Sequence, residues 1–454
     1  IEWRDEKRGA PPLILSALDL RVRSDGDKHS FGLVARPPME LSTRLEVRGE
    51  LDGRSLREAS GWSGRIYAEL GYTELAGWKA WVNYPVHLEH GTGAVRLWAE
   101  LEGGIVRQAT ADVQLSQVAA RLGEGLEPLR LRSLEGRLQA RRMPGNRAAQ
   151  GGDSYELSAS ALSVAPEGSP VLPPVDFQLA WKADGGQLHA NAVELEPVAL
   201  LAESLPLPAE MRSLAAKLAP RGQLADVRFE WSGDIAAPAR YRAQARFAEL
   251  GLRPYETLPG FTRLAGTLDA SERGGRLYLQ ARGAEIELPR VFPEPRLAFD
   301  ALSAQVEWQR DGDVLTFSAP AISFSNADLS GNAFGSYVYA GGGPGAIDFS
   351  AAITRAEAKN LAHYLPLGTL MGEKTRAWLA QGILAGRSSE VHVRLKGDLR
   401  DFPFLDPAQG QFQVRVQVQD GHLHYADGWP DVTGIDGELV FERDRLDITG
   451  RSGH

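Results

Sequence analysis

Two pairs of histidines are the residues whose types and spacing come closest to a metal site. His422 and His424 are two residues apart in an alternating segment, so on a strand both side chains would point to one face, as two ligands of one ion do. His87 and His90 have Glu89 between them and are similar. No third ligand at matching spacing follows the first pair. We therefore predict hydrogen-bonded or solvated strand histidines and no metal site.

Sequence motifs that mark catalysis do not occur in this chain. It has no G-x-S-x-G nucleophile elbow, no Walker loop and no H-E-x-x-H helix. Carboxylates are numerous, but none has the surroundings that mark general acid–base work. Gly341–Gly345 opens no helical pattern, which favours a hairpin tip over a phosphate cradle. We predict that the chain is not an enzyme and binds no cofactor.

The elements that would position any site are alternating strands joined by tight turns. In Val175–Ala190 and Leu302–Ala319, apolar side chains occupy every second position, an aromatic residue ends the first strand, and Asp-Gly follows. Asp-Gly is a strong hairpin signal because Gly accepts positive φ without a Cβ clash. Asp226–Asp234 and Gly437–Gly450 are variants of the pattern. The pattern predicts a mainly antiparallel β fold.

A second recurring pattern is an apolar residue, any residue, Gly, any residue and Leu, beginning at Leu134, Leu264 and Ile435. We expect the Gly to lie where two backbones approach or a strand bends. The irregular spacing of the copies excludes a fixed-period repeat such as a propeller. No linker divides the 454 residues, so we predict one repeating unit over 1–454 with helical insertions near 208–219 and 354–384. A shorter helical pattern occurs at Glu74–Val82.

Composition excludes several classes of function. The net charge of −9 has both signs interspersed, so no basic stripe for nucleic acid is present. The absence of cysteine excludes disulfides, zinc–thiolate sites and thiol nucleophiles. No apolar run approaches the roughly 18 residues that cross a bilayer. Because the chain opens at Ile1 in a polar stretch and stops at His454 after a strand-like segment, we expect it to be a piece of a longer protein.

Large aromatic residues end several strands on the side of their aliphatic residues. Trp181, Trp231 and Trp308 share this position, which indicates a continuous apolar face. Such a face must be covered by a second layer or by a ligand, and the chain has few amphipathic helices. The residues predicted from alternation to line the face are Val175, Phe177, Leu179, Trp181, Val227, Phe229, Trp231, Leu302, Val306, Trp308, Val414, Val416 and Val418. A register error of one residue would reverse a strand.

Several segments, in this order along the chain, resemble one family. They are Trp3–Gly9, Gly93–Leu101, Leu218–Trp231, the stretch His363–Leu367 followed by Arg376–Gly386, Leu395–Phe404 and Leu423–Leu439. Their number and order resemble the YhdP proteins, which belong to the AsmA-like group of Gram-negative envelope proteins. Each motif alone is weakly specific, but together they cover nearly the whole chain.

The resemblance implies an elongated, curved antiparallel sheet that forms an apolar, taco-like groove with a few short helices. It also implies phospholipid transport between the inner and outer membranes, with phospholipid acyl chains as the cargo and envelope proteins as possible partners. The chain would be a periplasmic portion of a protein anchored in the inner membrane. The anchor and the far C-terminal part of the family pattern are missing from this sequence.

Two other classes of function remain open at this point. The first is a structural or scaffolding envelope protein whose apolar face is closed by its own helices and binds no lipid. The second is a secreted carbohydrate-active β-solenoid or β-sandwich enzyme. Against the enzyme, the sequence has no clustered carboxylates near exposed aromatics, and it has more Asp-Gly hairpins than a parallel β-helix would.

Overall fold

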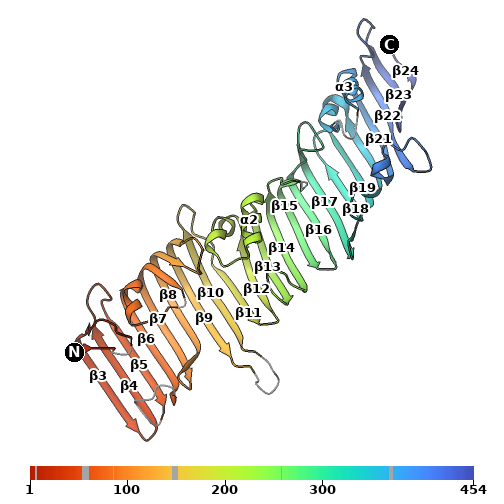
Figure 1. The fold of residues 1–454 in the computed structure, drawn as a ribbon. Coiled ribbons are helices and arrows are strands. Elements are labelled where there is room, and N and C mark those ends of the chain that lie inside the picture. Colours follow the sequence, from red (N-terminus) through yellow and green to blue (C-terminus); the bar gives the residue numbers. More distant parts are fainter. Residues whose placement is uncertain (6–7, 54–60, 85, 146–151, 257, 368–371) are drawn as a thin grey trace. The chain divides into compact units, whose positions relative to one another are not determined.

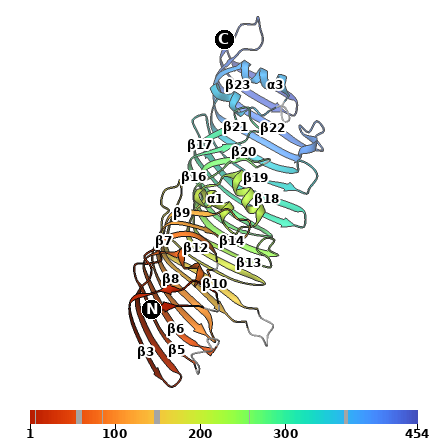
Figure 2. The same ribbon diagram turned by 60° about the vertical axis from the view of Figure 1, so that its left-hand side comes forward.

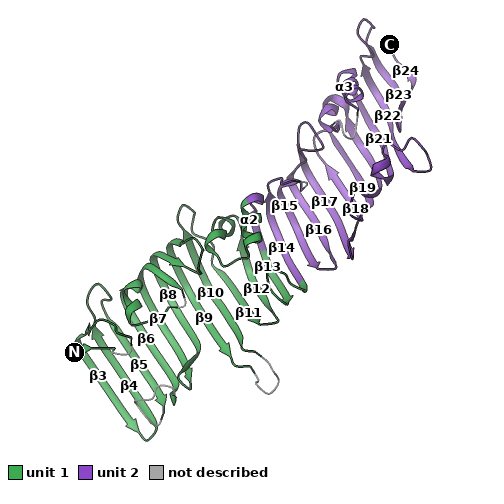
Figure 3. Ribbon diagram, in the orientation of Figure 1, with its two compact units in different colours: residues 1–216, 225–241 green, residues 217–224, 242–454 purple. Residues whose placement is uncertain are grey.

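The computed structural model describes residues 1–5, 8–53, 61–84, 86–145, 152–256, 258–367 and 372–454. The chain divides into two compact units (Figure 3). Unit 1 comprises residues 1–216 and 225–241, and unit 2 comprises residues 217–224 and 242–454. Each unit is built on an antiparallel sheet whose strands pair in chain order.

The sheet of unit 1 is open, because no ladder among its described residues joins its first strand to its last (Figure 1). Its strands are β3 (Ser16–Asp25), β4 (Lys28–Arg36), β5 (Leu45–Asp52), β6 (Ser63–Glu74), β7 (His87–Glu102), β8 (Ile105–Arg121), β9 (Leu129–Met143), β10 (Ser154–Pro166), β11 (Val175–Lys182) and β12 (Gly185–Glu194). The short strands β1 (Glu2–Trp3) and β2 (Leu13–Ile14) form a separate ladder.

The sheet of unit 2 is also open among its described residues. Its strands are β14 (Arg240–Leu252), β15 (Gly260–Ser271), β16 (Gly274–Glu287), β17 (Arg296–Asp311), β18 (Val314–Ser325), β19 (Leu329–Tyr339), β20 (Ala346–Glu357), β21 (Ile383–Asp398), β22 (Gly410–Leu423), β23 (Val432–Glu442) and β24 (Arg445–Ser452). Residues of β13 (Arg221–Ser232) belong to both units, as do those of β14. The predicted mainly β, antiparallel fold class is confirmed.

The predicted hairpins are present. β11 and β12 pair around the turn at Asp184, and β17 and β18 pair around the turn at Gly312. The Gly of the recurring apolar-x-Gly-x-Leu pattern lies where backbones are close, as expected. A Cβ added at Gly266 would be 1.9 Å from the carbonyl oxygen of Tyr278 on the next strand. No other residue fits there without a shift of the backbone.

Each sheet has two different edges. We call the one where strands turn directly the hairpin edge; its turns include those between β3 and β4, β11 and β12, and β17 and β18. We call the other the helix edge, because most of the helical segments interrupt its connections (Figure 1). These segments are η2 (Leu75–Ala80), α1 (Leu195–Leu200), η4 (Ala202–Ser204), α2 (Ala209–Leu218), η5 (Ala358–Tyr364) and α3 (Glu373–Gly382). The short η6 (Leu399–Asp401) is at the hairpin edge.

The helical segments differ in part from the expected insertions. α2 lies within 208–219, and η5 and α3 lie within 354–384. Residues Thr354–Glu357, however, continue strand β20, because Ala356 and Glu357 pair with β21 and Arg355 pairs with β19. Residues 368–371 of the expected insertion lie outside the described residues. None of the helices in the described part of the chain has the length and apolar content that a bilayer crossing requires.

Bulges interrupt many strands between their middle and the helix edge. Ala161 in β10, Glu249 in β14 and Asp420 in β22 have φ values of 49°, 51° and 51°, and each lies at a shift in strand register. A bulge bends its strand and increases the local twist. Figure 2 shows that the sheet of each unit is curved.

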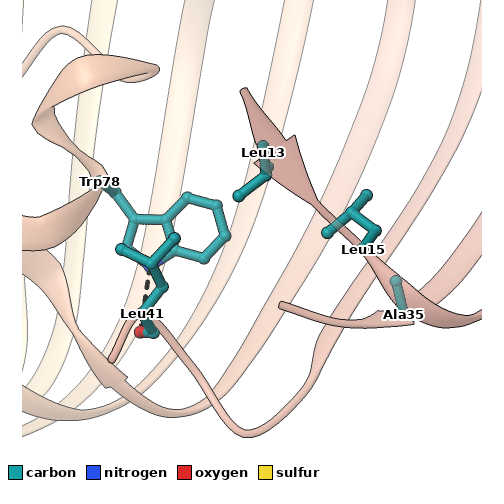
Figure 4. Packing of buried hydrophobic residues seen from close by; sticks show 5 residues of the cluster. All are labelled: Leu13, Leu15, Ala35, Leu41 and Trp78. Carbon is teal, nitrogen blue, oxygen red and sulfur yellow. Dashed lines mark hydrogen bonds between the residues drawn. The ribbon is translucent and has the colours of Figure 1, made fainter. Parts of the chain in front are cut away.

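Buried apolar clusters lie near the helix edge. In unit 1, Leu13, Leu15, Ala35, Leu41 and Trp78 pack together (Figure 4). The Trp78 indole N–H donates to the Leu41 carbonyl, at 3.3 Å, and η2 is thereby fixed to the connection between β4 and β5. In unit 2, Leu302 belongs to a cluster with Phe247, Leu264, Ala281 and Ala284.

Two helical connections also return along the helix edge to earlier loops of their own unit. In unit 1, Glu127 N donates to the carbonyl of Glu203, so the segment after β12 reaches the connection between β8 and β9. In unit 2, Leu367 N donates to the Val291 carbonyl, so the segment after β20 reaches the connection between β16 and β17. Each of these return segments fixes loops that are far apart in sequence.

Candidate functional site on the apolar faces

The strand registers separate the side chains of each sheet into two faces of different chemistry. In unit 1, the row Leu45–Leu70–Val95–Val113 crosses four strands, and the next position along each strand places Glu46, Glu69, Arg96 and Asp112 on the other side. In unit 2, Phe349, Leu395 and Phe412 form such a row. We call the hydrocarbon side the apolar face and the opposite side the polar face.

All thirteen residues predicted to line an apolar surface lie on the apolar face of their unit. Val175, Phe177, Leu179 and Trp181 are opposite Leu162, Ala159, Leu157 and Tyr155 of β10. In β13, Trp231 has its ring against Gly186, and Phe229 stacks on Trp231, with Val227 one alternation further. In unit 2, Leu302, Val306 and Trp308 are opposite Ala281, Leu277 and Gly275. Val414, Val416 and Val418 are opposite Phe441, Leu439 and Gly437.

Aromatic rings cover glycines on the hairpin side of the apolar face. A Cβ added at Gly275 would be 2.5 Å from the ring of Trp308, and one at Gly186 would be 2.5 Å from the ring of Trp231. Trp181 stacks on Tyr155, with ring centroids 5.5 Å apart. These broad rings provide apolar area without a second protein layer above them.

Exposure on the apolar face differs between its two sides. On the helix side, Leu302 is 7% exposed and Ala284 is completely buried. On the hairpin side, Tyr155 and Trp181 are each 37% exposed. Val306, Trp308 and most of the other predicted lining residues are partly exposed. Apolar area is therefore available to a ligand mainly away from the helix edge.

Charged pairs across strands occupy the polar faces. The Arg137 guanidinium donates to the Asp112 carboxylate at 2.6 Å and holds the pKa of Asp112 below its usual value. In unit 2, Arg276 is 3.4 Å from Glu307, and Arg394 and Lys396 both contact Asp348. These exposed pairs keep the polar face hydrated and add little to stability.

Two aromatic residues on the polar face were not predicted as special. Tyr67 and Trp98 lie opposite each other, with ring centroids 5.5 Å apart, and the Arg137 guanidinium is 5.8 Å from the Trp98 ring. The Tyr67 hydroxyl donates to Glu69 at 2.6 Å, and this hydrogen bond raises the pKa of Tyr67. The signal in the sequence was the position of Trp98 between Leu97 and Ala99, out of phase with the aliphatic residues.

Three of the four histidines singled out in the sequence pair with carboxylates. His422 lies in β22, but His424 lies just beyond the end of that strand, so the prediction that both are strand residues is wrong for His424. Asp431 accepts a hydrogen bond from His422 at 2.9 Å and one from His424 at 2.7 Å, so the two histidines share a partner that their sequence spacing did not indicate. His90 pairs with Glu74 at 2.7 Å, in a different place. In the part of the chain that the structure describes, no three His, Cys, Asp or Glu residues are grouped so as to hold a metal ion.

Comparison with known proteins identifies the family. The sequence model of the YhdP protein family matches residues 1–454. The chain belongs to the YhdP family. This family member is also 25% identical over 431 residues to the intermembrane phospholipid transporter YhdP of Escherichia coli strain K12. The match covers 90% of this chain and 32% of that transporter, so the chain spans about a third of the relative's length. No solved structure matches the chain.

The chemistry available on the apolar faces of this YhdP-family chain is the burial of hydrocarbon. Each CH₂ group removed from water contributes about 0.8 kcal/mol, so even a weakly specific surface can hold an acyl chain if it is long enough. The apolar rows supply such a surface in both units, and the polar faces supply none. A ligand with long hydrocarbon tails is therefore the class that these faces fit best.

Proposed function

We propose that this chain carries phospholipids, without catalysing a reaction, as part of a transporter between the inner and outer membranes of a Gram-negative envelope. In this proposal the acyl tails lie on the apolar faces of the two units, and the headgroups remain at their wet margins. The chain would work in the periplasm, as a portion of a membrane-anchored protein that envelope proteins could contact. The similarity to an intermembrane phospholipid transporter supports this function.

One observation supports the proposal most strongly: strand register places hydrocarbon on one face of strand after strand in each unit. Transfer of a lipid with two acyl tails through water is slow, because every CH₂ exposed costs about 0.8 kcal/mol. A face that shields tails at each step removes this barrier and requires no chemistry. The thirteen predicted lining residues are proposed to contact acyl chains.

The test is native mass spectrometry of the purified chain, combined with lipid extraction. We expect phospholipid to copurify, at more than one copy per chain. The pair of changes Phe229→Glu and Trp231→Glu introduces charge on the apolar face of β13 and should reduce the loading. Arg228→Glu is the matched control, because its side chain lies on the other face of the same strand.

The outcome separates transport from scaffolding. If the two glutamates abolish lipid loading while the chain remains folded, the apolar face binds tails. If they reduce loading and stability equally, Phe229 and Trp231 are simple core residues. A folded chain from which no lipid can be extracted would contradict the proposal and favour a scaffold that closes its own apolar face.

A further inference from the structure

Basic residues occupy some positions in the last row of the apolar faces, at the hairpin edge. Among the strand residues whose ladder partners the structure gives, the apolar faces carry hydrocarbon side chains or glycine as far as the last row, apart from the buried Thr73 near the helix edge. In that row, Ser24 and His29 lie at one end of unit 1 and Arg142 lies near the other. In unit 2, Arg310 is in this position. Both arginines stand where alternation would otherwise place an apolar residue.

Arg142 lies beside the stacked aromatic pair of unit 1. It is directly opposite Tyr155, which is in turn opposite Trp181, so all three side chains share the apolar face. The Arg142 Nε donates to the Asp153 carboxylate at 2.8 Å. Hydrogen bonds from Gly145 N–H and Arg142 hold the pKa of Asp153 below its usual value, and the charge of Arg107 adds to this effect. The guanidinium therefore already contacts one anion, at the exposed margin of the face.

Arg310 has the equivalent place in unit 2. It is opposite Leu315 and one alternation beyond Trp308, which is opposite Phe317. Its Nε donates to the carbonyl of Gly312 in the hairpin turn, at 3.1 Å. Among the described residues no carboxylate pairs with Arg310. In each unit an arginine thus lies next to an aromatic residue in the last row of the apolar face. Arg142 is opposite Tyr155 on the neighbouring strand, and Arg310 is one alternation beyond Trp308 on its own strand.

This arrangement matches the two parts of a phospholipid. Arginine can lay its methylene stem along an apolar surface while its charged group reaches water. The planar guanidinium fits the oxygens of a phosphate group and forms charge-assisted hydrogen bonds with them. Acyl tails that lie on the aromatic and aliphatic rows would bring the phosphodiester to the hairpin edge of the apolar face, where Arg142 and Arg310 lie. Asp153 occupies the place of such an anion beside Arg142.

We propose that Arg142 and Arg310 are headgroup-binding residues, each of which holds the phosphate of a phospholipid whose tails lie on the apolar face of its unit. This inference rests on the proposed function. The arginines at the hairpin edge of the apolar face recognise the phosphodiester, which is the group that all glycerophospholipids share. A neutral lipid with the same tails would contact the rows but not the arginines.

The experiment offers the whole chain a choice between two lipids with identical tails. Vesicles contain equal amounts of phosphatidylglycerol and diacylglycerol, and native mass spectrometry counts the copies of each lipid bound. The variant carries Arg142→Gln and Arg310→Gln. The control carries Arg141→Gln and Arg282→Gln, two arginines on the polar faces.

We expect the unchanged chain to prefer phosphatidylglycerol, and the preference to fall about tenfold in the variant but not in the control, because a charge-assisted hydrogen bond is lost at each site. Diacylglycerol loading should stay the same in all three chains, which shows that the variant remains folded. An unchanged preference, with both lipids still bound, would overturn the headgroup assignment and leave the proposed function intact. If the unchanged chain binds neither lipid, the proposed function fails as well.

A final arm distinguishes a lipid headgroup from a soluble anion. Inorganic phosphate is titrated into the lipid-free chain, and its binding is followed by calorimetry. No detectable binding at millimolar phosphate is expected if the tails bring the headgroup to the arginines. Tight binding that disappears in the Arg142→Gln and Arg310→Gln variant would assign the site to soluble phosphate and overturn the lipid assignment.

Discussion

Leu302 and Trp308 lie on one strand, β17, and on the same apolar face, yet their surroundings differ. Leu302 is near the helix edge, is 7% exposed and packs in the cluster with Phe247 and Leu264. Trp308 is near the hairpin edge, is partly exposed and covers Gly275. The same alternation of apolar residues therefore builds a buried core at one end of the strand and an available surface at the other. Alternation determines the face of a residue but does not determine what covers it.

The connections at the helix edge account for this difference. The segment after β20 returns to the Val291 loop, and Tyr364 in it donates a hydrogen bond to Asp328 at 2.9 Å and accepts one from Asn326 at 3.0 Å. The direct turns at the hairpin edge have no such length of chain. Burial thus accumulates where the connections are long. The long connection between β21 and β22 at the hairpin edge does the same, because it buries Phe404 against Gly397 and Gly410. The apolar face is open to a ligand where the turns are short.

The largest expected effect follows a truncation on the helix side. Leu302→Ala removes three carbons from a buried cluster and leaves a cavity, so it should lower the free energy of unfolding of unit 2 by about 2–5 kcal/mol. Hydrogen exchange of the amides in β16, β17 and β18, measured by mass spectrometry, reports this loss. Lipid loading of the chain that remains folded should be nearly unchanged.

Ser303→Ala is the control, because it changes the neighbouring side chain on the polar face. A loss below about 0.5 kcal/mol for Leu302→Ala, no larger than that of an ordinary surface substitution, would show that the helix side is as loosely packed as the hairpin side. The comparison between the two sides would then fail.

Trp308→Ala should have a smaller effect on stability and a larger one on lipid binding. Its ring is partly exposed, so its removal should cost about 1–2 kcal/mol, less than the burial of a whole aromatic side chain. The proposed lipid surface loses a broad ring at the same time. Urea denaturation and lipid counting by native mass spectrometry, on one preparation, measure both effects. A stability loss larger than that of Leu302→Ala would place Trp308 in the core.

Loss of the Tyr364 hydroxyl should have a still smaller effect. Tyr364→Phe removes the hydrogen bonds to Asp328 and Asn326 and keeps the ring, which should cost about 1 kcal/mol. Hydrogen exchange of η5 should increase more than that of β17. Tyr337→Phe is a matched control at the hairpin edge, where its hydroxyl donates to the Pro344 carbonyl at 2.8 Å. Equal exchange in η5 before and after the Tyr364 change would show that the hydroxyl does not fix the return segment.

Much of the fold could be predicted from the sequence because both faces of these sheets obey a period of two. The face of Trp181, Trp231 and Trp308 followed from alternation alone. The bulges could not be predicted in this way, because Ala161 and Glu249 are not residues that favour positive φ. Thr354–Glu357 resembled a helix locally, but its pairing with β21 is a contact with residues far along the chain, so it became strand.

The candidate site was predictable to the extent that it depends on alternation. Arg142 and Arg310 could have been noticed, because each is a charged residue in phase with apolar ones, but a single such residue has no meaning until its row across the sheet is known. Asp431 was missed as the partner of His422 and His424 because a loop, not a strand repeat, brings it back to them.

The smallest expected effect is a pH dependence of stability at the loop that carries Asp431. The hydrogen bond to Asp431 raises the pKa of His424 above 6.5, and the bonds from His424 and His422 lower the pKa of Asp431 below 3.8. The stabilisation that comes from the raised histidine pKa is complete when the pH is below the ordinary histidine pKa, and it is lost as the pH rises through the raised pKa. The stabilisation that comes from the lowered carboxyl pKa is complete above the ordinary carboxyl pKa, and it is lost as the pH falls through the lowered pKa.

The pair should therefore stabilise the loop most between about pH 4 and 6.5 and progressively less as the solution becomes alkaline. The difference in unfolding between the unchanged chain and His424→Gln should be larger at pH 5.5 than at pH 8.5, in urea titrations at constant ionic strength. His392→Gln is the control, because among the described residues this histidine forms an ion pair with the exposed Glu390 alone. A difference that grows toward pH 8.5 would mean that a neutral His424 is the form bound to Asp431, and that the loop is held by an ordinary hydrogen bond instead of a charged one.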